Sequence, residues 1–106
     1  MKRLFTCAFL LFWLHNLEAQ ETKKVLFLGN SYTAYNNLPH LVSQMAINTG
    51  DELIYDSNTP GGFRLMNHAS NTITLNKIQE DNWDFVTLQA QSQETSLSES
   101  QMQTEL

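Results

Sequence analysis

Three short apolar runs separated by helix-type repeats constrain the fold of this chain most strongly. The run Lys24–Gly29 (KVLFLG) is rich in β-branched and aromatic residues and ends in a glycine, which is typical of a strand buried on both faces. Residues 52–55 and 84–89 are expected to form a second and a third strand. Strands that alternate with helices require right-handed crossovers, so the pattern predicts an α/β fold with a parallel sheet covered on both faces, a three-layer sandwich.

The segments between these runs have helical periodicity. Asn37 and Pro39 mark a helix start and Gly50 a stop. Apolar residues recur between them at helical spacing: Leu38, Leu41, Val42, Met45 and Ala46. The cluster at residues 57–62 (SNTPGG) is a breaker, and further helices are expected beyond it. They cover residues 63–69, residues 73–78 after a break at Asn71–Thr72, and the polar segment from Ser96 onward. Four apolar residues of the middle region are spaced to share one face: Leu65, Ala69, Leu75 and Ile78.

Residues 1–19 have the pattern of a cleavable export signal. Lys2 and Arg3 precede an apolar run from Leu4 to Leu14, and the small residue Ala19 supplies the cleavage point. The apolar run is too short to cross a bilayer as a helix. We therefore expect a secreted or periplasmic protein, residues 20–106, with no stable membrane association after signal cleavage. The alternative is an uncut N-terminal anchor, because Leu17 is bulkier than cleavage usually prefers.

Composition excludes several classes of protein and of partner. Hydrophobic residues make up 42% and charged residues 16%, which suits a packed core and not a disordered, collagen-like or coiled-coil chain. The single cysteine, Cys7, lies inside the signal, so the mature chain has no thiol for a disulfide, a zinc site or a nucleophile. Cleavage after Ala19 leaves four basic and ten acidic residues, which makes nucleic acid a poor partner. No histidine motif suggests a metal site, and no cofactor is expected.

A polar loop follows each of the three expected strands. The loops are Gly29–Thr33 (GNSYT), Thr59–Gly62 (TPGG) and Gln89–Glu94 (QAQSQE). The carboxyl ends of parallel strands meet at one edge of a sheet, where loops assemble a crevice. The sequence therefore predicts one site built from all three loops.

In order and context these loops resemble the SGNH or GDSL-type hydrolases, which cleave esters and acetylated carbohydrates. The segment VLFLGNSYT stands in the place of the family's first block, GG follows the second strand, and WDFVTLQAQSQE stands in the place of the third block. The resemblance covers essentially the whole mature chain and is nearest to a secreted branch with GNS in its first block. It implies a flavodoxin-like SGNH hydrolase fold and a small-molecule or carbohydrate ester as substrate. Among such esters, acetyl groups on carbohydrates are the substrate class that the resemblance favours.

The resemblance also implies roles for residues of the first two loops. The serine of the first block is the family's nucleophile, which carries over onto Ser31. Its own N–H and a glycine N–H, here of Gly61 or Gly62, belong to the oxyanion hole. Fixed donors of this kind stabilise the negative charge of the tetrahedral intermediate, each by about 2.7–4 kcal/mol.

The third donor of the family's oxyanion hole is an asparagine, and glutamines stand in its place. Alignment through Asp84 puts Gln93 at that position, whereas the Gln-x-Gln-Ser form favours Gln91. Gln89 is the remaining candidate, for the oxyanion hole or for substrate contact. Asn30, Tyr32 and His68 are further candidates for contact with the substrate. Asn30 replaces the aspartate of the GDS form, and the alternative for His68 is a capping or partly buried histidine.

The family's general base is missing from these residues. It comes from a late Asp-x-x-His segment, and no Asp-x-x-His occurs in residues 1–106. His40 has no acid at that spacing to orient it. Because a sheet of this type usually needs about five strands, we expect residues 20–106 to be the N-terminal part of a domain truncated after about three strands, and inactive alone. Two alternatives remain open: a non-catalytic carbohydrate-binding relative and a flavodoxin-like cofactor-binding module.

Overall fold

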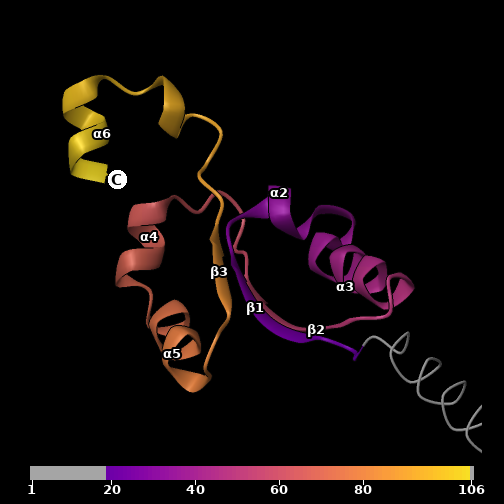
Figure 1. Ribbon diagram of the computed structural model, residues 1–106. Coiled ribbons are helices and arrows are strands. Elements are labelled where there is room, and N and C mark those ends of the chain that lie inside the picture. Colours follow the sequence, from indigo (N-terminus) through magenta and orange to yellow (C-terminus); the bar gives the residue numbers. More distant parts are fainter. Residues whose placement is uncertain (1–18, 106) are drawn as a thin grey trace, which may run out of the picture.

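The computed structural model describes residues 19–105, so the export signal expected over residues 1–19 lies outside the described residues apart from Ala19. The elements follow in the order β1 (Thr22–Leu28), α2 (Ser31–Ala34), the 3-10 turn η1 (Tyr35–Asn37), α3 (Leu38–Asn48), β2 (Glu52–Asn58), α4 (Leu65–Ser70), α5 (Thr72–Glu80), β3 (Phe85–Leu88), the 3-10 turn η2 (Glu94–Ser96) and α6 (Glu99–Glu105) (Figure 1).

The three strands form one open, all-parallel sheet in the order β2-β1-β3. β1 is the central strand, and Leu28 near the loops lies opposite Asn58 on one side and Leu88 on the other. The expectation of an α/β fold with a parallel sheet is thus confirmed. Four consecutive residues of β1 are buried: Val25, Leu26, Phe27 and Leu28. This run is the core, which accounts for the uninterrupted apolar sequence of the strand.

Helices lie on both sides of this sheet. Figure 1 shows α3 on one side and α4 with α5 on the other. The expected start of α3 is confirmed, with Asn37 before the helix and Pro39 in its first turn. Gly50 follows the end of α3 with a φ of 86°, a conformation that glycine adopts at low cost.

The structure corrects several sequence-based boundaries. Ser57 and Asn58 continue β2, although both were expected in a breaker, because they pair with Phe27 and Leu28 of β1. The helix expected from residue 63 begins at Leu65. The break between α4 and α5 is confirmed at Asn71, whose Oδ1 accepts the N–H of Thr74 at 2.9 Å.

β3 is a confirmed strand that is not buried on both faces. It pairs only with β1 among the described strands, and Phe85 and Leu88 are 59% and 63% exposed. The apolar pattern of β3 therefore matches a central strand, while its position in these residues is at an edge. No helix within residues 19–105 has the length and apolar character needed to span a bilayer.

Candidate functional site

Direct hydrogen bonds join the three loops that the sequence singled out. The side chain of Asn30 donates to the carbonyl of Phe63 at 3.0 Å, which links the first loop to the residue directly after the second loop. The Oε1 of Gln89 accepts the N–H of Asn30 at 3.0 Å, which links the first loop to the third. The N–H of Leu65, the first residue of α4, donates to Oε1 of Glu94 at 2.9 Å and so links the start of the helix after the second loop to the third loop.

Asn30 organises the first loop. Its side chain is buried, and its Oδ1 accepts the N–H of Tyr32 at 3.1 Å as the N-cap of α2. Because the same carboxamide also donates to Phe63, both of its polar atoms are occupied within the protein. These bonds give Asn30 a role in loop structure, and the substrate contact expected from the sequence stays a prediction. An aspartate could not make the bond to Phe63, since an ionised carboxylate has no hydrogen to donate.

Ser31 is exposed and is the first residue of α2. Within residues 19–105, neither its N–H nor its hydroxyl has a hydrogen-bond partner. The next residues of the turn are already engaged, because Thr33 and Ala34 both donate to the carbonyl of Asn30 at 3.1 Å. The loop thus leaves one hydroxyl and one backbone donor available on the same residue.

Gly61 and Gly62 form an exposed turn after β2. The N–H of Phe63 donates to the carbonyl of Pro60 at 3.2 Å, and Gly62 has a φ of 71°. A glycine at this third position is the requirement of a type II turn. A Cβ on either glycine would meet no atom within 4 Å, so both face open space. Within the described chain, neither glycine N–H has a recorded acceptor.

The three glutamines have different surroundings. Gln89 is occupied at both ends of its carboxamide: Oε1 also accepts the Thr33 hydroxyl at 2.8 Å, and Nε2 donates to the Ala90 carbonyl at 2.6 Å. The Oε1 of Gln91 accepts the N–H of Gln93 at 2.7 Å, which leaves the amide nitrogen of Gln91 as a donor. The side chain of Gln93 is exposed. Gln89 is therefore the least available of the three for a ligand.

Gly29 is required by the contact between the first and third loops. A Cβ at this position would lie 2.6 Å from Gln89 Oε1 and 2.6 Å from Thr33 Oγ1. Real Cβ atoms essentially never come this close to another atom, so any side chain at Gly29 would displace the Gln89 carboxamide and the Thr33 hydroxyl from these positions. The glycine that marked the end of the strand in the sequence thus permits the hydrogen bonds around Asn30.

His68 is buried, and both of its ring nitrogens are hydrogen-bonded. Nδ1 lies 2.7 Å from the Thr74 hydroxyl, and Nε2 lies 2.7 Å from the carbonyl oxygen of Gly29. The ring therefore has no nitrogen left for a substrate, in contrast to the substrate contact considered from the sequence. The alternative reading of a buried histidine describes its surroundings better. Tyr32, the remaining candidate for substrate contact, is 64% exposed beside Ser31.

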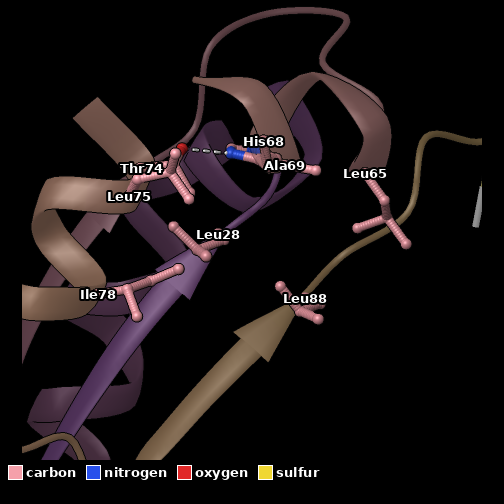
Figure 2. Close-up of a pocket in the computed structure, with 8 residues that line it drawn as sticks. All are labelled: Leu28, Leu65, His68, Ala69, Thr74, Leu75, Ile78 and Leu88. Carbon is pink, nitrogen blue, oxygen red and sulfur yellow. Dashed lines mark hydrogen bonds between the residues drawn. The ribbon is translucent and has the colours of Figure 1, made fainter. Parts of the chain in front are cut away.

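A largely apolar cavity of about 200 Å³ lies next to His68 (Figure 2). It is bounded by the ends of β1 and β3 and by α4 and α5. Its lining consists of Leu28, Leu65, His68, Ala69, Thr74, Leu75, Ile78 and Leu88. The four residues expected to share a helical face all line it, so that expectation is confirmed.

Sequence reasoning assigned no role to three buried polar residues of the site. Thr33, Thr74 and Glu94 are all at most 5% exposed. Oε2 of Glu94 has no hydrogen-bond partner in the part of the chain that the structure describes. Threonine and glutamate side chains are mostly exposed in proteins, and no local pattern distinguishes these residues from their neighbours. Only the packing of distant segments identifies them.

The described residues contain no group of three or more histidine, cysteine, aspartate or glutamate side chains arranged to hold a metal ion. His40 is exposed on α3. No family model matches the chain, and searches of curated proteins and of solved structures found no match.

Proposed function

We propose that this chain carries the nucleophile and oxyanion hole of an SGNH-type serine hydrolase that cleaves carboxylic esters through an acyl-enzyme on Ser31. The observation that carries the proposal is a triangle of hydrogen bonds between the loop of Ser31, the segment Phe63–Leu65 directly after Gly61–Gly62, and the loop Gln89–Glu94. Segments about 30 residues apart thereby meet at one edge of a parallel sheet, as such a site requires.

In the proposed reaction the Ser31 hydroxyl attacks the ester carbonyl carbon and the carbonyl oxygen becomes negatively charged. Donors for this oxyanion are the N–H of Ser31, an N–H of Gly61 or Gly62, and the carboxamide of Gln91 or Gln93. Gln91 is preferred because the bond from Gln93 N–H holds its oxygen and orients its amide nitrogen. The acyl group is transferred to Ser31 and the alcohol leaves with a proton.

The distribution of free backbone donors supports acyl transfer over the flavodoxin-like alternative. A phosphate at a helix start is bound by several N–H groups of the first turn. Here the N–H groups of Tyr32, Thr33 and Ala34 all donate to Asn30, and the N–H of Asn30 donates to Gln89. One available N–H at Ser31 suits a single oxyanion better than a phosphate.

The proposal requires a general base, which the family takes from an Asp-x-x-His segment. We propose that residues 20–106 are the N-terminal part of a larger domain that supplies this base, exported to the periplasm or secreted. The exposed apolar strand β3 supports that proposal, because an additional parallel strand would cover it. Acetylated carbohydrates remain the leading substrate class.

The first test is the reactivity of Ser31 towards a fluorophosphonate probe. In the 106-residue chain we expect slow labelling at Ser31, faster in the folded protein than in urea. An oxyanion hole without the base retains about 10³–10⁴-fold catalysis over water in other serine hydrolases. The measurement is peptide mass spectrometry of the labelled protein over time.

Two variants complete this test. Ser31→Ala should abolish the labelling that depends on the folded protein, whereas Ser92→Ala, at an exposed serine of the third loop, should leave it unchanged. A polypeptide that also contains an Asp-x-x-His segment should release acetate from an aryl acetate orders of magnitude faster. Equal labelling of Ser31 in folded and unfolded protein would refute the proposal, and a yellow chromophore in the purified protein would favour the flavodoxin-like module.

A further inference from the structure

We propose that His68 is a positioning residue that holds the peptide group before the nucleophile loop, through a neutral imidazole protonated on Nε2. The inference rests on the role proposed for Ser31. It assigns to His68 neither the function of a general base nor contact with the substrate, because both ring nitrogens are used inside the protein.

The peptide group between Gly29 and Asn30 is held from both sides. Its carbonyl oxygen lies 2.7 Å from Nε2 of His68, and its N–H donates to Oε1 of Gln89 at 3.0 Å. The preceding N–H, that of Gly29, donates to the carbonyl of Asn58 at 3.2 Å. A side chain from α4 and one from the third loop thus hold opposite edges of one peptide plane, since the C=O and N–H of a trans peptide point in opposite directions.

The hydrogen-bond partners determine which nitrogen of His68 carries the proton. A carbonyl oxygen only accepts, so Nε2 must donate to Gly29. The Thr74 hydroxyl then donates to Nδ1 and in turn accepts from Nδ2 of Asn58 at 2.8 Å. Figure 2 shows the contact between His68 and Thr74 from adjacent helices. All hydrogen bonds in this series are satisfied when the ring is neutral.

These hydrogen bonds form a closed cycle that begins and ends at Gly29. The side chain of Asn58, at the end of β2, donates to the Thr74 hydroxyl, and this hydroxyl donates to Nδ1 of His68. Nε2 of His68 then donates to the Gly29 carbonyl, and the Gly29 N–H donates to the Asn58 carbonyl. Ser31 follows this peptide by one residue. A rotation of the held peptide plane would turn the Ser31 N–H and hydroxyl away from a bound ester, and displacements of about 1 Å can reduce rates by about 100-fold.

The direct test uses NMR to measure the tautomer of His68 and the amide exchange of Asn30. Long-range ¹H–¹⁵N spectra of the 106-residue chain should show His68 as the Nε2–H tautomer. In His68→Leu, amide exchange of Asn30 should accelerate by more than that of Leu26 in the core. In His68→Gln the Asn30 amide should remain protected, because the Gln amide nitrogen can replace Nε2 as donor. A loss of overall stability alone would accelerate the amide exchange of Asn30 and of Leu26 to the same extent.

The labelling reaction adds a functional readout. His68→Leu should slow fluorophosphonate labelling of Ser31 by about tenfold, the factor expected for one lost hydrogen bond, and His68→Gln should restore most of the rate. If His68→Leu fails to fold, Thr74→Val takes its place, with Thr74→Ser as the control that keeps the hydroxyl. Thr74→Val should slow labelling and weaken the Nε2–H tautomer signal, and Thr74→Ser should change neither.

The outcomes separate this inference from the proposed function. An Nδ1–H tautomer in the wild-type chain, or unchanged Asn30 exchange in His68→Leu, would overturn the positioning role. If Ser31 is not labelled in the wild-type protein but the NMR results are as expected, His68 holds the loop and the hydrolase proposal is wrong. If Ser31 is labelled equally fast in His68→Leu and wild type, the hydrolase proposal stands and the positioning role is wrong.

Discussion

At the scale of single residues, the site depends on buried polar groups whose partners come from other loops. Asn30, His68 and Thr74 are each at most 3% exposed, and each has at least two hydrogen bonds. A buried polar atom that loses its partner costs about 1–3 kcal/mol. Substitutions that keep the shape of these side chains but change one donor should therefore have measurable effects.

Asn30→Asp is the sharpest such substitution. It replaces the Nδ2 donor by an oxygen that faces the carbonyl oxygen of Phe63, while the N-cap bond to Tyr32 can persist. We expect a loss of about 1–3 kcal/mol in the free energy of unfolding, measured by urea denaturation. Asn76→Asp, at an exposed position of α5, should cost far less. Equal losses in the two variants would contradict the role given to Asn30.

At the scale of secondary-structure elements, the connection between α5 and β3 is tied to β1 near its start. Lys24 Nζ forms an ion pair with Asp81 Oδ1 at 2.9 Å. The backbone N–H of Lys24 donates to Oδ2 of Asp84 at 2.7 Å, and the Asp84 N–H donates to the Lys24 carbonyl at 2.8 Å. These contacts hold β3 in register beside β1 at the end of the sheet opposite the site.

The ion pair predicts a pH dependence of stability. The hydrogen bond from Lys24, followed by the one from the Asn82 N–H, lowers the pKa of Asp81 below its ordinary value of 3.8. A lowered pKa in the folded state means that the stabilisation is fully present above pH 3.8 and is lost as the pH falls through the folded-state pKa. Because both side chains are partly solvated, the effect should be small.

Asp81→Asn tests this prediction by urea denaturation between pH 2 and 6. Its unfolding free energy should fall less steeply with acid than that of the wild type, and Lys24→Met should reduce the same part of the pH dependence. An unchanged acid dependence in both variants would show that the pair contributes nothing to stability.

At the scale of the whole molecule, the sheet is open along β3. Phe85, Val86 and Leu88 are 59%, 41% and 63% exposed, and the strand pairs on one side only within the described residues. An exposed apolar edge strand presents unpaired backbone groups and apolar side chains to other molecules. The same feature supports our proposal that further strands complete the domain.

The open edge predicts self-association of residues 20–106. Sedimentation of the purified polypeptide should show a weight-average mass that rises with concentration. Val86→Lys should suppress this increase, because a charge on the edge strand opposes strand pairing. Ile47→Lys is the matched control, since Ile47 is 57% exposed on α3. A monomer at all concentrations, or equal suppression by both variants, would contradict the prediction.

The order of elements was predictable because it depends on local periodicity. The apolar run of β1 indicates a strand, and the helical repeat of α3 indicates a helix. Parallel topology then brings the loops that follow the strands to one edge of the sheet. The short helix α2 was missed because its four residues are too few to show a helical repeat. The turn η1 was missed because Asn36 and Asn37 adopt left-handed conformations (φ 54° and 53°) without a glycine to signal them. The exposure of β3 was not predictable from its residues, since burial depends on the neighbours of a strand and not on its composition.

The sequence by itself therefore determined the fold class, the order of the strands along the chain, and the three loops that form the candidate site. Tertiary structure decided that Gln89 is occupied while Gln91 keeps a donor, and that His68 faces the Gly29 carbonyl instead of solvent. The physical reason is the range of the interactions. Helices and strands reflect spacings of two to four residues, whereas the contacts of Gln89 and His68 with the first loop join residues 39 to 59 positions apart.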